Sequence, residues 1–360
     1  MEARSGPESV TGRNRPNLHK YWRQNVSAFL RQRLVRGAIS AIMPDVMTSD
    51  SARSGRRLVV FGEFFLDLVF YDLPRVPRMG EEVKTASFAV FPGGGLATTA
   101  LVAAGLGTPT SAITRVGRDA LASPAWQALV EGGVSTECCE TNLRLPTAMT
   151  ICAAFGGDRM MITHDVINRK LEKLLRRGDV KEKIRKAKHL HLACALWPPQ
   201  AWAPAIRIFR RHGLTLSADI GWNPEVLKSA KFPALLREFE FVFPNEMEAR
   251  TLTGEKTVER AAQKLARWTR VPVIKLGEDG SLAVHNGTMV RMKSIRVKAV
   301  DATGAGDAFN GGFLHGYLAG WPIGDCLRAG NICGALATTR AGGSSAIPSQ
   351  KKLRELMKKI

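Results

Sequence analysis

A nine-residue stretch near the carboxyl end of the chain, Asp301–Phe309 (DATGAGDAF), has the residue types of a phosphate-handling site. The small residues Gly304, Ala305 and Gly306 leave the backbone bare, so successive N–H groups can converge on an anion where a helix begins. Asp307 would lie in the first turn of that helix, next to the same anion. A carboxylate in that place can take the proton of a hydroxyl group while the hydroxyl attacks a γ-phosphate.

The same residues could instead form a turn with a helix cap and no chemistry. They are not a dinucleotide-binding fingerprint, because Phe309 stands where Gly-x-Gly-x-x-Gly requires its third glycine. The chain also contains neither a Gly-x-x-x-x-Gly-Lys-Ser/Thr loop nor the motif set of protein kinases. Phosphotransferase chemistry therefore needs support from the rest of the sequence.

The elements around this motif predict an α/β fold. The motif follows an apolar segment, Ile295–Val300, that we expect to be a strand, and it opens a helix that we expect to run to about Ala319. From Arg57 onward, short apolar runs alternate with helical stretches, which is typical of a parallel sheet covered by helices on both faces. The predicted strands include 58–61, 189–194, 214–218, 239–243 and 271–276, and the predicted helices include 200–212, 246–252 and 258–268.

Two stretches interrupt this alternation. Leu68–Phe91 and Thr147–Thr163 have the pattern of strands joined by turns, with no helix between them. We expect them to form a small antiparallel lid that excludes water from a closed site. The predicted fold is thus a three-layer α/β/α sandwich with a mostly parallel central sheet and a small β-lid.

Three motifs resemble, in the same order, the signatures of the ribokinase (PfkB) family of carbohydrate kinases. Asp301–Phe309 resembles the second signature, and Gly62–Gly117 resembles the first signature region, with PRMGEE and FPGGGLATTALVAAGLG. Phe243–Gly254 (FPNEMEARTLTG) resembles the Asn-x-x-Glu segment. The resemblance runs from Arg57 to the C-terminus. It implies an ATP-dependent kinase that transfers the γ-phosphoryl group to a hydroxyl of a sugar or sugar derivative.

The resemblance also implies roles for individual residues. Asp307 would be the base, and Gly304, Ala305 and Gly306 would form an anion hole for the transferring phosphoryl group. Glu248 would help to hold Mg²⁺, either directly or through water, because magnesium keeps several of its waters. The further implied sites are for substrate (Asp67, Gly93, Gly94 and Thr98), nucleotide (Asn245, Lys275, Gly277 and Asn331) and a monovalent cation, expected to be K⁺ (Asp301, Thr303 and Gly342).

Two departures from the family pattern weaken an assignment to ribose: Thr98 stands where relatives often have Asn, and Phe65 where ribokinases tend to carry a polar residue. A nucleoside kinase of the same fold is the alternative, with Phe64, Phe65 and Trp197 as candidates for stacking on a base, although apolar packing explains these side chains equally well. His189 and His191 alternate on one face of a predicted strand. We interpret them as packing residues rather than metal ligands.

The formal charge of +20 indicates a surface that attracts anions. Much of this charge lies in Arg169–Lys188, which we interpret as a solvated helix face. The charge permits an alternative of another class, a non-catalytic nucleic-acid-binding or regulatory protein. No basic motif interleaved with aromatic residues is present, so we expect no nucleic-acid partner.

Composition and segment lengths predict a cytoplasmic protein with no membrane segment. No apolar run approaches the roughly 20 residues of a membrane helix. The six cysteines include no Cys-x-x-Cys pair, which suits reduced thiols. We interpret residues 1–55 as a basic extension that is disordered or arises from a mis-assigned start, and residues 56–360 as the kinase domain. Because lids of this family often pair between subunits, a homodimer through the lid is a further expectation.

Overall fold

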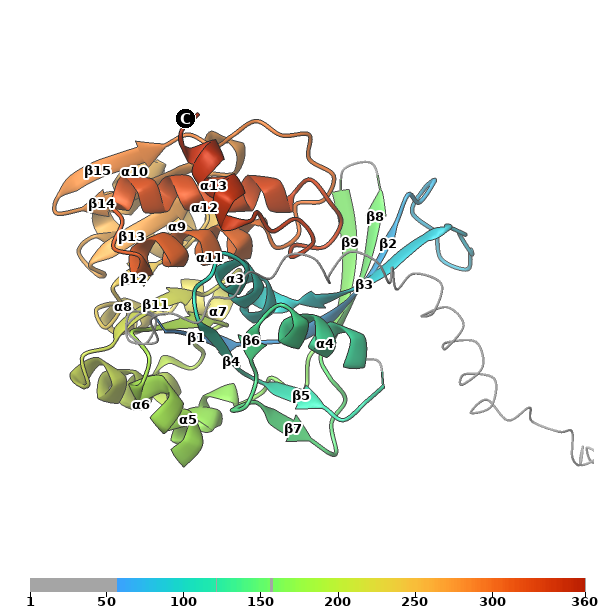
Figure 1. Ribbon diagram of the computed structural model, residues 1–360, viewed down its shortest axis with the longest axis horizontal. Coiled ribbons are helices and arrows are strands. Elements are labelled where there is room, and N and C mark those ends of the chain that lie inside the picture. The colour runs from blue at the N-terminus through green and yellow to red at the C-terminus, as the bar shows by residue number, and fades with distance from the viewer. Residues whose placement is uncertain (1–56, 121, 156–157, 360) are drawn as a thin grey trace, which may run out of the picture. The chain divides into compact units, whose positions relative to one another are not determined.

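The computed structural model describes residues 57–120, 122–155 and 158–359, so the expected extension, residues 1–55, lies outside the described residues. In this part of the chain nine strands form one sheet in the order β15-β14-β13-β12-β11-β10-β1-β4-β6 (Figure 1). The strands from β13 to β6 pair in parallel, whereas β14 and β15 add to the β13 edge antiparallel. Their bounds are β1 Leu58–Gly62, β4 Thr110–Ile113, β6 Val134–Ser135, β10 His189–Ala193, β11 Thr215–Asp219, β12 Phe241–Val242, β13 Val271–Lys275, β14 Ser281–His285 and β15 Thr288–Met292.

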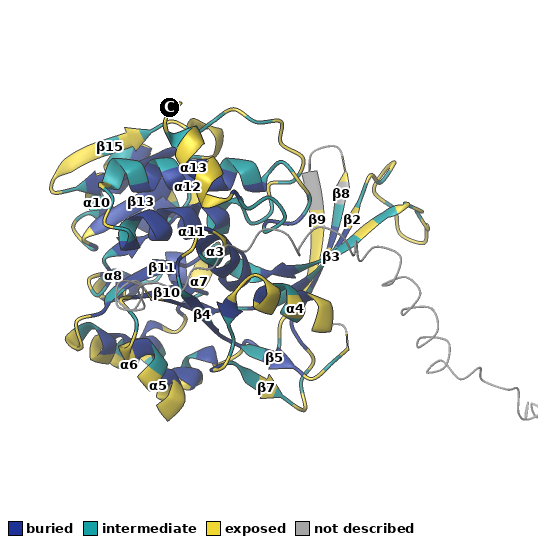
Figure 2. Cartoon of the chain, in the orientation of Figure 1, coloured by how far each residue is buried: buried dark blue, intermediate teal, exposed yellow. Residues whose placement is uncertain are grey.

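The side chains of β1 alternate between two apolar cores on opposite faces of this sheet. Val59 and Phe61 belong to one core, and Leu58 and Val60 belong to the other, as expected for a strand that is buried on both faces. Figure 2 shows that the strands of this sheet are buried, whereas α5 (Gly178–Arg185) and α6 (Pro199–Arg211), which cover one of its faces, are exposed on their outer sides. The arrangement confirms the predicted three-layer sandwich with a mostly parallel sheet.

Each core is covered by its own set of helices. The first contains residues of α5 (Gly178–Arg185), α6 (Pro199–Arg211), α7 (Pro224–Leu227), α8 (Phe232–Leu236), α9 (Glu246–Thr253), α10 (Val258–Leu265) and the 3₁₀ helix η1 (Leu171–Arg176). The second contains residues of α3 (Gly94–Gly105), α4 (Ser123–Glu131), α11 (Ala305–Leu318) and α12 (Ile323–Ala337). The final helix, α13 (Gln350–Met357), shares a small core with α12. Throughout the described chain, each helix is too short or too polar to traverse a lipid bilayer.

A second, four-stranded sheet in the order β3-β2-β8-β9 holds the stretches expected to form a lid. Its strands are β2 Phe65–Tyr71, β3 Ser87–Gly93, β8 Met149–Phe155 and β9 Asp158–His164. The expectation of an antiparallel lid is wrong for the central pair, because β2 and β8 run parallel. Strand β2 follows β1 of the large sheet and β8 follows β7 (Glu140–Asn142), while β3 and β9 return antiparallel to them. A two-stranded sheet of β5 (Arg115–Gly117) and β7 completes the strands described.

The segment before the glycine-containing turn differs from the prediction. Ile295–Val300 was expected to be a strand, but β15 ends at Met292 and the chain continues to α11 without pairing in a sheet. Ile295, Val297 and Ala299 line a cavity instead. Their alternation of apolar side chains therefore reflects one wall of a cavity rather than a buried strand.

Helix α11 is held against the sheet by aromatic packing. Phe313 lies edge-on to Phe241 with ring centroids 5.1 Å apart, and Phe309 lies edge-on to Phe243 at 6.4 Å. The helix begins at Gly304, whose φ of 70° is in the left-handed region that glycine adopts at little cost. This packing places the first turn of α11 at the carboxyl ends of β11 and β13.

Candidate active site

Three elements bring charged side chains together at the carboxyl edge of the large sheet. Asp219 ends β11 and Lys275 ends β13, and the two form a buried ion pair. Asn310 of α11 donates a hydrogen bond from Nδ2 to the same Asp219 oxygen at 2.6 Å. A Cβ added to Gly306 would lie 3.1 Å from Lys275 Nζ, so the ammonium group lies directly beneath the predicted anion-binding turn. The positive charge of Lys275 is thereby fixed where a phosphoryl group would meet α11.

Asp307, in the first turn of α11, has an environment suited to proton transfer. Burial raises its pKa to about 7, and the neighbouring carboxylate of Asp219 adds to the rise, while Lys275 opposes it. For Asp219 the effect of burial is outweighed by the charge and hydrogen bond of Lys275, so its pKa stays below the ordinary value. The pair Asp219–Lys275 therefore remains ionised, and Asp307 can gain or lose a proton near neutral pH.

The glycines at the start of α3 let the chain pass close to the carboxylates of Asp67 and Asp307. A Cβ on Gly93 would lie 2.1 Å from Asp67 Oδ2, and a Cβ on Gly95 would lie 3.0 Å from Asp307 Oδ1. Gly94 has a φ of 81°, and a Cβ there would lie 2.4 Å from the Glu63 carbonyl oxygen. Glycine is thus required at Gly93 and Gly94 for steric reasons. The structure brings the predicted substrate residues Asp67, Gly93 and Gly94 to the same edge as Asp307.

Two threonines of α3 contact the Gly304–Gly306 turn and the residue that follows it. Thr98 is buried, and a Cβ on Gly304 would lie 3.3 Å from its Oγ1. Thr99 donates a hydrogen bond from Oγ1 to the Asp307 carbonyl at 3.0 Å. Of the predicted anion-hole residues, Ala305 directs its N–H back to the Ala302 carbonyl at 3.3 Å. Thr98, predicted to bind substrate, thus lies against the turn that begins α11.

Asn245 and Glu248 form a reciprocal helix cap at the start of α9. The Asn245 side chain accepts from the Glu248 N–H, and Glu248 Oε2 accepts from the Asn245 N–H, both at 2.8 Å. Glu248 is only 4% exposed, and burial together with the charge of Asp219 raises its pKa. Since Glu248 also raises the pKa of Asp307, its carboxyl group belongs to the same electrostatic cluster. The cap and a metal-binding role are therefore compatible.

A cavity of about 770 Å³ opens beside the turn. Three of the predicted nucleotide residues, Lys275, Gly277 and Asn331, line it together with Gly306; Asn245 is not among its lining residues. The Asn331 amide nitrogen donates to the carbonyls of Met292 and Lys293 at 3.0 and 3.2 Å. This amide group therefore fixes the end of β15. The remaining wall combines apolar side chains such as Ile295, Val297 and Phe309 with the charged Glu278, Asp279 and Arg296.

The residues predicted to bind a monovalent cation also converge. Asp301 Oδ1 accepts from Thr303 N at 2.9 Å and from Thr303 Oγ1 at 2.6 Å, while Asp301 Oδ2 accepts from Gly342 N at 3.0 Å. A Cβ on Gly342 would clash with the ring of Phe91 in β3, so the loop packs closely against the second sheet. Asp301 thus ties the turn before α11 to the loop that follows α12.

The sequence analysis missed Asp219 and Asn310. Asp219 could have been found as the acid that ends a predicted buried strand, and Asn310 as the polar residue one helical turn after Asp307. Phe64, a candidate for base stacking, is completely buried and packs edge-on against Trp126 at 5.6 Å, so it cannot contact a ligand. Trp197, the tryptophan among the three candidates, is 40% exposed after β10.

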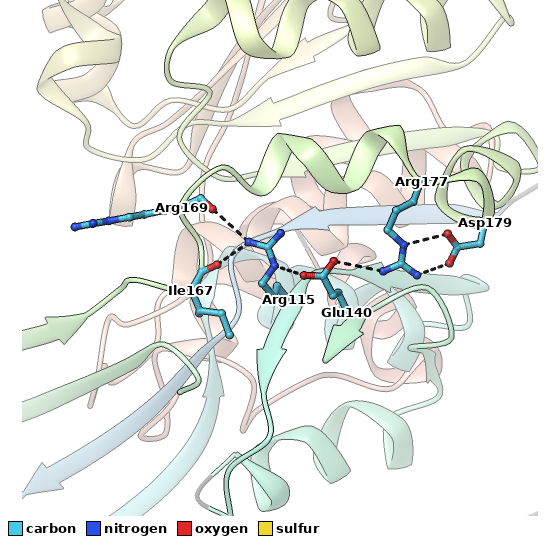
Figure 3. A network of polar contacts seen from close by, with 6 residues as sticks. All are labelled: Arg115, Glu140, Ile167, Arg169, Arg177 and Asp179. Carbon is cyan, nitrogen blue, oxygen red and sulfur yellow. Dashed lines mark hydrogen bonds and ion pairs between the residues drawn. The ribbon is translucent and has the colours of Figure 1, made fainter. Parts of the chain in front are cut away.

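Arg115 belongs to a structural network away from this cluster (Figure 3). Its guanidinium pairs with Glu140 and donates to the Ile167 and Arg169 carbonyls at 3.0 and 3.3 Å. Arg177 joins the network by pairing with Asp179 and lying 3.9 Å from Glu140. These two arginines thus connect the β5–β7 sheet to the segment around η1.

Comparisons with known proteins agree with this architecture. Residues 56–350 match the family described as pfkB family carbohydrate kinase. A ribokinase of Lactococcus lactis is 26% identical over 305 residues, which are 84% of this chain and 98% of that protein. An Arabidopsis thaliana ribokinase solved with ribose and ATP covers 84% of this chain and 99% of its own, with a TM-score of 0.71 and 23% identity. An E. coli protein described as ribokinase II, solved with ATP and Mg²⁺, covers the same shares with a TM-score of 0.71 and 22% identity.

The raised pKa of Asp307 predicts a pH-dependent cost in stability. The folded protein holds this proton up to about pH 7, well above the ordinary pKa of 3.8. Proton binding therefore contributes its full stabilisation to the folded state at low pH, and this contribution is lost as the pH rises through 7. Asp307→Asn removes the charge, so the variant should be more stable than the wild type at about pH 8, and the difference should shrink towards about pH 5. Urea unfolding of both proteins between about pH 5 and 8 measures this difference in the free energy of unfolding. A variant less stable than the wild type at about pH 8 would contradict the assigned environment.

Proposed function

The chain belongs to the pfkB family of carbohydrate kinases, and we propose that it transfers the γ-phosphoryl group of ATP to a hydroxyl group of a sugar or sugar derivative, with Asp307 as the base. The observation that carries this proposal is the partly buried Asp307 carboxyl group, whose pKa is raised to about 7, placed beside the Gly304–Gly306 turn and a cavity of about 770 Å³. A group that titrates near neutral pH can accept the hydroxyl proton and later release it.

In the proposed reaction the protein supplies a base and fixed positive potential. Ionised Asp307 takes the proton of the attacking hydroxyl, while backbone N–H groups at the start of α11 and the Lys275 ammonium group stabilise charge on the phosphoryl group. The Asp219–Lys275 pair keeps that ammonium group in place. No covalent intermediate on the protein is required, because the hydroxyl attacks the phosphorus directly.

The nucleotide would occupy the cavity lined by Lys275, Gly277 and Asn331, with its phosphates towards Gly306. Mg²⁺ would lie near Glu248 and Asn245, contacting the protein through water, and would neutralise charge on the phosphates. A single buried carboxyl group fits this role, since magnesium prefers oxygen ligands and keeps most of its waters. The acceptor would lie near Asp67, Gly93, Gly94 and Thr98.

A nucleoside acceptor remains the alternative, with Trp197 exposed near the carboxyl edge of β10. The non-catalytic reading has less support, because the base, the turn and the cavity are all present. In the basic run, Arg177, Lys183 and Lys186 are engaged in ion pairs, which favours a solvated surface over a nucleic-acid site.

Six cysteines without disulfides, 138, 139, 152, 194, 326 and 333, support a cytoplasmic location.

We further propose that a monovalent cation, K⁺, binds at Asp301, Thr303 and Gly342. Asp301 links the turn before Gly304 to the loop of Gly342, so a cation there would fix the start of α11. Charge at this point would also add to the positive potential that stabilises the phosphoryl group.

We also propose a homodimer formed through the second sheet. The registers place Phe70, Phe88, Ile151, Met160 and Ile162 on one face of that sheet, and each of them is exposed. Contiguous exposed apolar surface of this kind marks an interaction site, and a second copy presents a matching face.

Substitution of the base tests the proposed reaction. ADP release would be measured with Mg²⁺ and K⁺ across sugars, sugar phosphates, sugar acids and nucleosides, for the wild type and for Asp307→Asn. Asparagine keeps the size of the side chain but cannot accept the proton, so we expect turnover to fall by about 10²–10⁴-fold. Asp325→Asn, a surface carboxylate on α12, is the matched control and should retain activity. Undiminished turnover in Asp307→Asn would refute the assignment of the base.

The cation proposal predicts that kcat is several-fold higher in K⁺ than in tetramethylammonium at equal ionic strength. The reason is that only a small cation can enter the loop around Asp301 and order the start of α11. Asp301→Asn should weaken this dependence. Equal kcat values in both salts would contradict the proposal.

The dimer proposal predicts that the wild type sediments as a dimer at micromolar concentration. Ile162→Glu places a charge on the exposed apolar face, on the edge strand β9, and should give a monomer. Leu143→Glu, at an exposed leucine outside that sheet, is the control and should remain dimeric. A wild type that is monomeric over the whole concentration range would exclude this interface.

A further inference from the structure

A row of buried polar side chains crosses the apolar core between α11 and the sheet. His189 and His191 of β10 lie beside Thr215 and Ser217 of β11 in the parallel register. His189 Nδ1 is 2.8 Å from Thr215 Oγ1, His189 Nε2 is 2.7 Å from Ser217 Oγ, and Ser217 Oγ is 2.7 Å from His191 Nδ1. Both histidines and Ser217 have no exposed surface. We call Thr215, His189, Ser217, His191 and Asp219 the polar seam.

Both ends of the polar seam are attached to α11. At the amino end of β11 the Tyr317 ring packs edge-on against His189 with centroids 5.5 Å apart and its hydroxyl interacts with Thr215, and at the carboxyl end Asn310 is hydrogen-bonded to Asp219. Asn310 and Tyr317 are two helical turns apart, a rise of about 10 Å, whereas β11 rises about 13 Å between Thr215 and Asp219. The helix and the strand therefore meet at two polar contacts, and the side chains span the difference of about 3 Å.

The hydrogen bonds of the polar seam have one consistent direction. Thr215 donates from Oγ1 to the Lys188 carbonyl at 3.1 Å, so it accepts from His189 Nδ1–H. His189 Nε2 then accepts from the Ser217 hydroxyl, whose oxygen accepts from His191 Nδ1–H. Both rings are neutral in this arrangement, in agreement with burial, which lowers the pKa of His191 to about 4 and that of His189 well below its ordinary value.

Aromatic packing alone would not set the position of α11 along the sheet. The contacts of Phe309, Phe313 and Tyr317 with Phe241 and Phe243 are apolar and tolerate sliding, because dispersion has little directionality. Hydrogen bonds in a buried site are directional, and breaking them leaves polar groups without partners, which is costly. A shift of α11 by one residue, about 1.5 Å, would break the contacts at both ends.

We propose that the polar seam positions α11, and with it Asp307 and the Gly304–Gly306 turn, for phosphoryl transfer, so that His189, Ser217 and His191 are positioning residues. The inference rests on the proposed kinase function. The hydrogen bonds of the seam end at His191, whose Nε2 has no hydrogen-bond partner among the described residues, and the seam meets Asp219 through the electrostatic interaction between His191 and that carboxylate. Asp219 in turn contacts both Lys275 and Asn310. The charged groups that face Asp307 and Asp219 from the surrounding elements are Lys275 of β13, Asp67 of β2 and Glu248 of α9.

Two buried serines of the same sheet give a matched test. Ser217 holds both histidines, whereas the hydroxyl of Ser281 on β14 has no partner among the described residues, and both side chains are completely buried. Ser217→Ala should lower kcat about tenfold or more and leave the KM for ATP within about twofold, because misplacement of the base and turn affects the transition state more than binding. Ser281→Ala should keep both constants at wild-type values.

Tyr317→Phe provides a second variant that keeps the aromatic ring and removes one hydroxyl at the end of the seam. It should show the same pattern, a several-fold lower kcat with an unchanged KM for ATP, and it decides the matter if Ser217→Ala does not fold. An unchanged kcat in the folded Ser217→Ala variant, or an equal loss in Ser281→Ala, would overturn the proposal.

Imidazole nitrogen-15 spectra separate failure of this inference from failure of the kinase proposal, since they need no turnover. In the wild type, His189 and His191 should both be neutral and protonated at Nδ1 between about pH 6 and 8. A charged His191, or one protonated at Nε2, would overturn the seam. A wild type with the expected spectra and no turnover would instead contradict the kinase function.

Discussion

The burial of the Asp307 carboxyl group beside the Asp219–Lys275 ion pair is the constraint on which the rest of the site depends. Burying several charges together is costly unless each is paired or neutralised. Here Lys275 pairs with Asp219, and the third group, Asp307, responds by binding a proton up to about pH 7. The same burial that weakens the fold at neutral pH thus provides a base whose pKa matches the pH at which it must work.

This constraint explains why the surrounding backbone is so rich in glycine. Gly93, Gly95 and Gly306 have no Cβ at places where one would meet the carboxylate of Asp67, that of Asp307 or the ammonium group of Lys275. Small residues allow three elements from distant parts of the chain to pack within a few ångströms of one another.

The sequence predicted the layers, most strand positions and the residues of the turn, because apolar periodicity and the glycine-containing motif are local signals. The local signals for Asp219 and Asn310, an acid at the end of a strand and a polar residue one helical turn after Asp307, are common in proteins, and their importance arises only when β11, β13 and α11 pack together. Ile295–Val300 shows the converse error: its apolar alternation fits a strand, but its side chains line the nucleotide-sized cavity. His189 and His191 were correctly placed in the core, yet their hydrogen bonds to Ser217 depend on strand register, which the sequence leaves open.

The most direct test of the account is the protonation state of Asp307 itself. Carbon-13 spectra of protein labelled only at aspartate carboxyl carbons would be followed from about pH 4 to 9, for the wild type and for Asp307→Asn. The account predicts one aspartate that titrates near pH 7 and is missing from the variant. If every aspartate instead titrates below about pH 5, Asp307 is not held as a neutral-pH base, and the central claim is wrong.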